Sequence, residues 1–498
     1  MPELTGTLGT SVNGPEGLPS FDGDAWERVD WRRHEEQVRR LRGRIFKAVQ
    51  EGDWPLARNL QKLALRSWSN TLVSVRQVTQ RNTGRRTAGI DGLVALTSQA
   101  RAEMAVRVHA SIGSHRPSPV RRVYIPKASD KTKMRPLGIP VISDRCHQAR
   151  VRNALEPEWE ARFEPRSYGF RPGRGCYDAI ESLYNTLHGK SRRVWILDAD
   201  LAGAFDKISH GHLLGMLGGF PARDMIAGWL KAGIFEAGKG FAPTGEGTPQ
   251  GGVISPLLLN IALHGLEEAA GVRYRTGVHA GDVRDGCPAL TRYADDLVVC
   301  CHSRQQAEQV QARLAGWLEP RGLAFNEAKT RIVPLSEGFD FLGFNLRRYP
   351  NGKLLIKPGV MAIKRFRNRL AREFRALRGA NVAAVLARIV PITRAGSPTT
   401  GRWCRPGCSV PWTIICGNSL ISGRAGATRI SRKAGSSAGT SGSSRSSGMT
   451  GGYSATKTPA PTCRDWPGPI SCGIPWSKAG HHPMTPPWPG TGRNAARR

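Results

Sequence analysis

The chain is 498 residues long and carries 73 Lys and Arg against 39 Asp and Glu, which gives a formal net charge of +34 at pH 7. This excess is larger than solubility requires and predicts a polyanionic partner, with nucleic acid as the default. No apolar run reaches the roughly 18–20 residues that span a membrane and the start lacks a secretory signal, so we expect no membrane segment and a cytoplasmic protein.

The N-terminal part is expected to be helical after a disordered leader. Residues 1–20 are rich in Gly, Pro and Thr, a composition typical of disorder. From Trp26 onward apolar residues recur with a helical spacing, and Gly52 ends this first helix. A second helix begins near Pro55, because proline is favoured in a first turn. The basic outer faces of these helices leave two interpretations open, RNA contact or a merely solvated surface.

A basic β-hairpin is expected next. Its strands are Val123–Lys127 and Met134–Pro140, separated by a polar turn. Lys127 and Arg135 then lie on adjacent strands, where an ammonium and a guanidinium can together hold a triphosphate. The alternative is that both are ordinary surface cations on an edge hairpin.

Two apolar stretches end in acidic residues. Val194–Leu201 predicts a strand that ends at Asp200, and Leu290–Cys301 predicts a β-hairpin with Asp295 and Asp296 at its tip. Three carboxylates from two such strands can hold two Mg²⁺ ions about 3.5–4 Å apart, the arrangement used in phosphoryl transfer. Taken singly, an Asp-Asp step is more often a solvated turn than a metal site, and the alternative for Asp198 and Asp200 is that they merely end a strand.

Two glycine-rich loops complete the pattern. Ser167–Gly175 combines Gly, Arg and aromatic residues, a mixture that suits phosphate contacts and base stacking. Gly247–Asn260 runs from a glycine-rich turn into an apolar helix, and we expect its glycines to let the backbone approach a ligand closely. Helices are predicted elsewhere over Asp144–Phe163, Tyr177–Leu187 and Ser303–Leu318, with a very basic helix from Met361.

These stretches, in this order, resemble the reverse transcriptases encoded by bacterial group II introns, which also serve as maturases. The resemblance covers residues 24–394. Its strongest parts are Arg135–Pro140, Ser167–Gly175, Asp198–His210, Gly247–Asn260, Tyr293–Asp296 and Gly322–Thr330. Retron enzymes share the Tyr-x-Asp-Asp signature, but their typical Asn-Ala-x-x-His and Val-Thr-Gly elements are absent from this sequence.

The resemblance implies an α+β fold, the fingers and palm of a right-hand polymerase, with a ferredoxin-like antiparallel palm sheet. It also implies an N-terminal helical region and the start of a helical thumb. The expected domains are a leader (1–20), an RNA-binding helical region (21–98), fingers and palm (99–345), an incomplete thumb or maturase domain (346–394) and a disordered tail (395–498).

The same resemblance implies a role for each site residue. Asp200, Asp295 and Asp296 are expected to hold two Mg²⁺ ions, helped by the carbonyl of Leu201. Phe205 matches the steric gate that disfavours a ribose 2′-hydroxyl. The other expected contacts are Gln250 beneath the incoming nucleotide, Lys127 and Arg135 on its phosphates, and Phe341, Leu342, Gly343 and Phe344 as the primer grip.

The implied activity is RNA-directed DNA synthesis, in which intron RNA is copied onto a DNA primer or target from dNTPs, together with help in splicing. A bacterial cytoplasmic location and a possible homodimer accompany it. A viral-type RNA-copying polymerase is one alternative, against which Phe205 and the Gly247–Asn260 stretch argue. A non-catalytic RNA chaperone is another, and the intact set of three Asp residues argues against it.

The last hundred residues do not resemble the family. The likeness ends near Arg394, helical periodicity is absent beyond it, and Asp465 is the only acidic residue after that point. A reading frame shifted by one base permits family-like strings over Pro398–Arg405 and Trp476–Gly492. We therefore expect a frameshift near Ala395, from a mutation or a sequencing error, that replaces most of the thumb. The alternative is a natural low-complexity RNA-binding tail.

Overall fold

The computed structural model describes residues 21–126, 132 and 134–396. The expectations for the leader, for Lys127 and for the tail beyond residue 396 lie outside these residues. The described residues up to Pro334 belong to one compact unit, and those from Leu335 onward belong to a second.

The first unit begins with a group of helices. Asp30 and Asp53 cap two of them, since each side chain accepts a bond from the backbone N–H three residues later, and Pro55 lies in the first turn of the second. The two helices predicted from periodicity are thereby confirmed. The helices of this region are α1 (Gly23–Glu27), α2 (Trp31–Gln50), α3 (Trp54–Arg66), α4 (Trp68–Arg76), α5 (Ser98–Ala110) and α6 (Ile142–Arg162).

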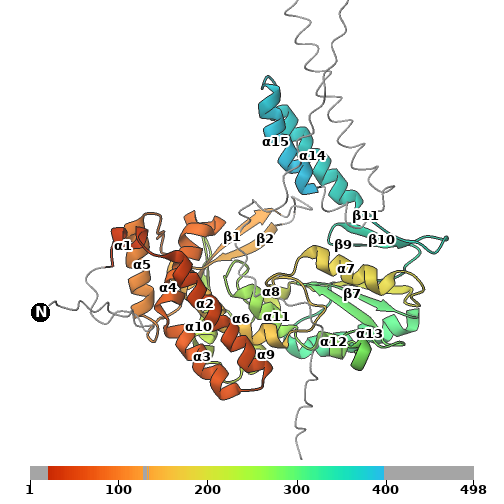
Figure 1. The fold of residues 1–498 in the computed structure, drawn as a ribbon, viewed down its shortest axis with the longest axis horizontal. Coiled ribbons are helices and arrows are strands. Elements are labelled where there is room, and N and C mark those ends of the chain that lie inside the picture. Colours follow the sequence, from red (N-terminus) through yellow and green to blue (C-terminus); the bar gives the residue numbers. More distant parts are fainter. Residues whose placement is uncertain (1–20, 127–131, 133, 397–498) are drawn as a thin grey trace, which may run out of the picture. The chain divides into compact units, whose positions relative to one another are not determined.

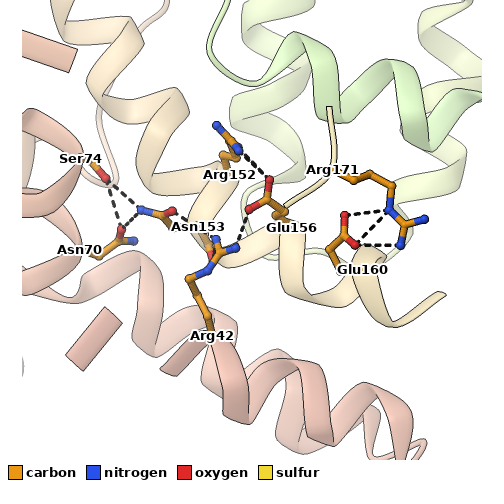
Figure 2. A network of polar contacts seen from close by, with 8 residues as sticks. All are labelled: Arg42, Asn70, Ser74, Arg152, Asn153, Glu156, Glu160 and Arg171. Atoms are coloured by element: carbon orange, nitrogen blue, oxygen red, sulfur yellow. Dashed lines mark hydrogen bonds and ion pairs between the residues drawn. The ribbon is translucent and has the colours of Figure 1, made fainter. Parts of the chain in front are cut away.

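Helix α6 packs against the helices that precede it. Its apolar side joins a core that includes Trp26 and Leu72. Its polar side carries Glu156, which is 3% exposed and accepts a bond of 2.5 Å from Arg42 of α2 (Figure 2). Asn153, also on α6, donates to Asn70 of α4 at 2.8 Å. A buried carboxylate is tolerated only with such partners, so these bonds fix the N-terminal helices on α6.

A basic hairpin starts the first sheet, as predicted. Strands β1 (Val120–Pro126) and β2 (Met134–Ile139) are antiparallel, and Ile125 pairs with Arg135. Strand β4 (Ile234–Glu236) adds to the other edge of β1 in parallel, and β5 (Gly240–Ala242) follows it.

The second sheet holds the acidic stretches. Its order is β6-β7-β3-β8 and all its pairings are antiparallel. The strands are β3 (Trp195–Asp200), β6 (Ala289–Tyr293), β7 (Asp296–Cys301) and β8 (Arg331–Pro334). Helix α7 (Cys176–Leu187) packs against β6, and α13 (Arg304–Leu318) packs against the other three strands (Figure 1). Strands β3 and β7 are the two central strands of this sheet. The last residue of β3 therefore lies beside the first residue of β7, at one end of the two strands.

The glycine-rich turn before α11 (Ser255–Ala262) approaches the chain's own backbone closely. A Cβ on Gly247 would lie 2.5 Å from the carbonyl oxygen of Asp206, and one on Gly251 would lie 2.5 Å from that of Gly138. Both glycines also have positive φ. Only glycine meets both demands, so the turn is packed between the first sheet and α8 (Ala204–Lys207). The remaining helices here are α9 (His210–Leu217), α10 (Arg223–Lys231) and α12 (Leu266–Ala269).

The second unit has a small sheet and a helical hairpin. Strands β9 (Phe339–Phe341), β10 (Phe344–Arg348) and β11 (Leu354–Pro358) form an antiparallel sheet in the order β11-β10-β9. Helices α14 (Val360–Ala376) and α15 (Val382–Gly396) pack through Leu370, Ile389 and Ile392. Across the described residues, no helix combines the length and apolar character needed to cross a membrane.

Candidate active site

Two carboxylates face each other across neighbouring strands. Asp200 ends β3, Asp296 begins β7, and the antiparallel register pairs them directly. Tyr293 also pairs with Asp296 across the β6–β7 hairpin, so Asp295 lies in a two-residue turn between them. The structure thus brings together the three Asp residues that the sequence singled out.

An unusual backbone conformation shapes this turn. Ala294 has φ 58°, in the left-handed region, where a non-glycine residue costs roughly 1–2 kcal/mol. Two-residue hairpin loops favour such positive φ values because their twist then matches that of the strands. Gly169 packs so tightly on the turn that a Cβ added there would lie 2.2 Å from the backbone nitrogen of Ala294. The surroundings therefore hold the strained residue in place.

The three carboxyl groups repel one another. Desolvation first, and then the charges of Asp295 and Asp200, raise the pKa of Asp296 to about 7 from an ordinary value of 3.8. Burial, with added repulsion from Asp200, also raises the pKa of Asp295. Asp296 itself is exposed at the surface, and the repulsion between the three carboxylates adds to the effect of desolvation. The site is therefore short of positive charge.

Lys329 supplies part of that charge. Its ammonium forms an ion pair with the side chain of Asp200, and this bond is the main reason that the pKa of Lys329 is raised. The segment that carries Lys329 lies beside β3, since the backbone N–H of Asn326 donates to the carbonyl of Asp200 at 2.8 Å and that of Ala202 donates to Ala324 at 2.9 Å. These bonds flank Leu201 and leave its own carbonyl out of the pairing.

Phe205 and Gln250 lie on elements that touch each other. The ring of Phe205 is half-buried in α8, and its centroid is 6.1 Å from that of Phe170, which comes from the Ser167–Gly175 loop. The side-chain amide of Gln250 donates to Asp206, the neighbour of Phe205, at 3.0 Å. A half-buried ring is compatible with a surface that contacts a ligand, whereas a fully buried ring would have indicated an ordinary core residue.

The basic hairpin contributes positive charge to this region. The guanidinium of Arg135, on β2, acts on Asp295 and lowers the pKa of that carboxyl against the larger effect of burial. Arg122, on β1, acts in the same direction on Asp206, whose pKa burial raises. One of the two proposed phosphate-binding cations is therefore within electrostatic reach of the carboxylates.

The expected primer-grip residues form a tight turn in the second unit. Phe341 ends β9 and pairs with Phe344, the first residue of β10. Leu342 has φ 49° and Gly343 has φ 85°, so both turn residues are left-handed, as a two-residue hairpin favours. Phe341 and Phe344 are both buried.

Comparison with known proteins decides the family. A family model described as reverse transcriptase (RNA-dependent DNA polymerase) matches residues 125–346, and a model of the N-terminal domain of reverse transcriptase matches residues 26–108. Protein YkfC of Escherichia coli (strain K12) is 35% identical over 325 residues, which cover 59% of this chain and 84% of YkfC. The chain belongs to the reverse transcriptase family.

Within this family the chain groups with group II intron proteins. The group II intron-encoded protein LtrA of Lactococcus lactis subsp. cremoris is 43% identical over 161 residues, which cover 31% of this chain and 26% of LtrA. Among solved structures, telomerase from Candida albicans, in complex with a fragment of telomeric RNA, is 14% identical, with a TM-score of 0.36 over 61% of this chain and 55% of that chain. The resemblance to intron-encoded reverse transcriptases and maturases is confirmed, and the mixed α and β architecture fits the fingers and palm of a polymerase.

The chemical type of the three Asp side chains suits Mg²⁺. Carboxylate oxygen is the ligand that Mg²⁺ prefers, and a divalent cation between Asp200, Asp295 and Asp296 would relieve the repulsion that raises their pKa values. Among the described residues, however, no group of three or more His, Cys, Asp and Glu side chains is arranged to hold a metal ion. The structure instead engages Asp200 with Lys329, so a metal at Asp200 would compete with this ion pair.

Three residues of this region had no expected role: Lys329, Arg122 and Arg292. Lys329 lies within Gly322–Thr330, one of the stretches that most resemble the family. A lysine in such a stretch could have been considered as a site residue. Arg122 precedes the predicted hairpin strand by one residue, and nothing distinguished it from other surface arginines. Arg292 immediately precedes Tyr293. It is buried in the structure, but a sequence with so many arginines gives no sign of which of them is buried.

Proposed function

We propose that this chain is an RNA-directed DNA polymerase that copies the RNA of a group II intron into DNA and binds that RNA to assist splicing. The observation that supports it most is the direct pairing of Asp200 with Asp296, with Asp295 in the adjoining turn. In this proposal the sheet β6-β7-β3-β8 is the palm, the β1–β2 hairpin belongs to the fingers, and α14 begins the thumb.

Each residue acts on a different part of the substrates. Asp200, Asp295 and Asp296 would hold two Mg²⁺ ions, whose positive charge would lower the pKa of the primer 3′-hydroxyl and stabilise the charge of the transferring phosphate. The ring of Phe205 excludes a ribose 2′-hydroxyl, and Gln250 supports the incoming nucleotide. The phosphates of that dNTP are held by Lys127 and Arg135, and the primer by Phe341–Phe344.

RNA binding rests on the basic surface. The net charge of +34 supports a polyanionic partner, and intron RNA is the one we propose for the N-terminal helices. On α14 the exposed side chains include Lys364, Arg365 and Arg367, which support a further phosphate-contacting surface in the second unit.

A templated primer-extension assay tests the proposal. Asp295→Ala and Asp200→Ala should abolish extension and leave RNA affinity largely unchanged, because a lost metal ligand removes transition-state stabilisation whereas affinity depends on many phosphate contacts. Asp224→Ala is the matched control, since that side chain is fully exposed on α10. Near-normal extension by either test variant at saturating Mg²⁺ would refute the assignment.

We also propose that a frameshift near Ala395 replaces most of the thumb. Two apolar residues of α15 support this idea, since Val382 is 75% and Leu386 is 51% exposed, as expected for a helix that packs on α14 with one face and has a second apolar face uncovered. Without a complete thumb to hold the template–primer duplex, extension should be poorly processive. DNA sequencing across codons 390–400 tests the proposal, and it fails if no single-base insertion or deletion there restores a long family-like frame.

A further inference from the structure

A buried arginine lies next to the acidic turn. Arg292, on β6, is 1% exposed and precedes Asp295 by three residues. Its Nη1 donates to the carbonyl oxygen of Ala294 at 3.0 Å and to Oδ1 of Asn260 at 2.8 Å. Its Nη2 donates to Oγ of Ser167 at 2.6 Å. One guanidinium thus contacts the strained residue of the turn and two residues from distant parts of the chain.

These contacts join three of the stretches on which the family resemblance rests. Ser167 opens the Ser167–Gly175 loop, and Asn260 ends the Gly247–Asn260 stretch inside α11. Asn260 also donates to the carbonyl oxygen of Gly169 at 2.9 Å. Gly169 in turn packs against the backbone of Ala294. The contacts therefore form a closed ring around the turn, and neither Ser167, Asn260 nor Arg292 has a role in the function proposed above.

The backbone reinforces the same ring. The N–H of Arg292 donates to the carbonyl of Arg166 at 3.0 Å, and the N–H of Tyr168 donates to the carbonyl of Arg292 at 2.9 Å. Arg171, also buried, donates to the carbonyls of Glu164 and Ser167 and pairs with Glu160 of α6 (Figure 2). The loop that meets the turn is thereby attached to a long helix.

Two carboxyl groups act on the charge of Arg292: Glu267, which is buried, and Glu164, whose own pKa is raised to about 8 by desolvation and by Glu267. The pKa of the Arg292 guanidinium is lowered to about 10 by burial, against the raising effect of Glu164 and Glu267, so it stays charged at neutral pH. Glu164 accepts from the N–H of Glu267 at 2.8 Å, and Glu267 accepts from the N–H of Arg166 at 2.9 Å. A charge at this depth is tolerated because its surroundings are polar and hydrogen-bonded.

We propose that Arg292 is a positioning residue, which fixes the Ala294 carbonyl and thereby the direction of the Asp295 and Asp296 carboxylates. It contacts neither substrate nor metal, and Ser167 and Asn260 hold it in place. This inference rests on the function proposed above. The physical reason is that a left-handed alanine persists only where its surroundings determine it, and Arg292 is the side chain that bonds its carbonyl.

Ser167→Ala and Asn260→Ala test this role in the full-length chain, because each removes one support and keeps Arg292. Thr291→Val is the matched control, since Thr291 is buried beside Arg292 and its hydroxyl has no hydrogen-bond partner among the described residues. Mn²⁺ binding is measured by electron paramagnetic resonance, and amide hydrogen exchange is compared between the turn (293–296) and α2. Affinity for RNA is measured in parallel.

We expect both variants to bind Mn²⁺ about 10- to 100-fold more weakly, as loss of a supporting contact around a metal ligand typically does. Exchange should be faster in the turn alone, and RNA affinity should match that of Thr291→Val. The inference is overturned if both variants match the control in Mn²⁺ affinity and turn exchange, or if exchange accelerates equally in α2. The exchange comparison needs no activity, so it remains decisive even if the wild-type chain extends no primer and the proposed function fails.

Discussion

At the scale of single residues, Asp296 links the site to stability. Its pKa of about 7 means that the folded protein holds this proton more tightly than the unfolded chain, where Asp titrates near 3.8. The stabilisation from this group is therefore fully present below about pH 4 and is lost as the pH rises through about 7. Ionisation of Asp296 without metal thus destabilises the fold.

Asp296→Asn should remove this dependence. In EDTA, we expect the variant to have a flatter profile of thermal stability between pH 4 and pH 7, and a higher Tm than wild type at pH 8. Because the side chain is exposed, the gain should be discounted to about 1 kcal/mol, which corresponds to about 1–2 °C in Tm for a unit of this size. Asp224→Asn, on exposed α10, serves as the control. A variant profile parallel to that of wild type would contradict the reasoning.

Phe205 should govern the choice of sugar. If its half-buried ring fills the space of a 2′-hydroxyl, Phe205→Ala should raise the use of rNTP relative to dNTP by about 10- to 200-fold, the range over which shape alone discriminates. The measurement is kcat/KM for each nucleotide in primer extension. Phe241→Ala, on the exposed face of β5, controls for the loss of an aromatic ring. An unchanged ratio in an active variant would exclude the gate.

At the scale of elements, the Ser167–Gly175 loop and the β6–β7 hairpin have to fit closely. A Cβ on Gly169 would meet the backbone of Ala294 at 2.2 Å, so Gly169→Ala should displace the turn. We expect a loss of about 1–3 kcal/mol of stability from overpacking, and a fall in extension rate of about 100-fold if the carboxylates move by about 1 Å. Gly113→Ala is the control, since nothing lies within 4 Å of a Cβ there. Equal rates in the two variants would count against the close fit.

The same elements explain what the sequence could predict. Helix α2 and the hairpins follow from periodicity and turn chemistry, which are local properties. The acidic turn was predictable because its flanking strands are apolar. The contact between Lys329 and Asp200 joins residues 129 positions apart, and no local pattern encodes such a pairing. Arg292 was missed because charged residues are rarely buried, and its burial depends on partners from two other stretches.

At the scale of the whole molecule, the charge of +34 predicts a strong effect of salt on RNA binding. Each neutralised phosphate releases counterions, so 6–10 contacts cost roughly 10³- to 10⁵-fold in affinity between 50 and 200 mM salt. Replacing the exposed Arg365, Arg369 and Arg372 of α14 by Gln should make the plot of log affinity against log salt less steep. Filter binding at several salt concentrations measures this slope. A wild-type slope near zero would refute the basic-surface interpretation.

The buried ion pairs of α6 affect how the chain can be divided into separately expressed fragments. Glu156 and Glu158 are 3% and 1% exposed, and their partners Arg42 and Arg58 belong to α2 and α3. Cutting at the expected boundary near residue 98 would remove Arg42 and Arg58 and leave each carboxylate with one arginine of its own helix among the described residues, Arg152 beside Glu156 and Arg162 beside Glu158. The helices before this cut therefore supply half of the ion pairs that hold these two glutamates, and we expect a fragment that begins near residue 98 to be less stable than the intact unit.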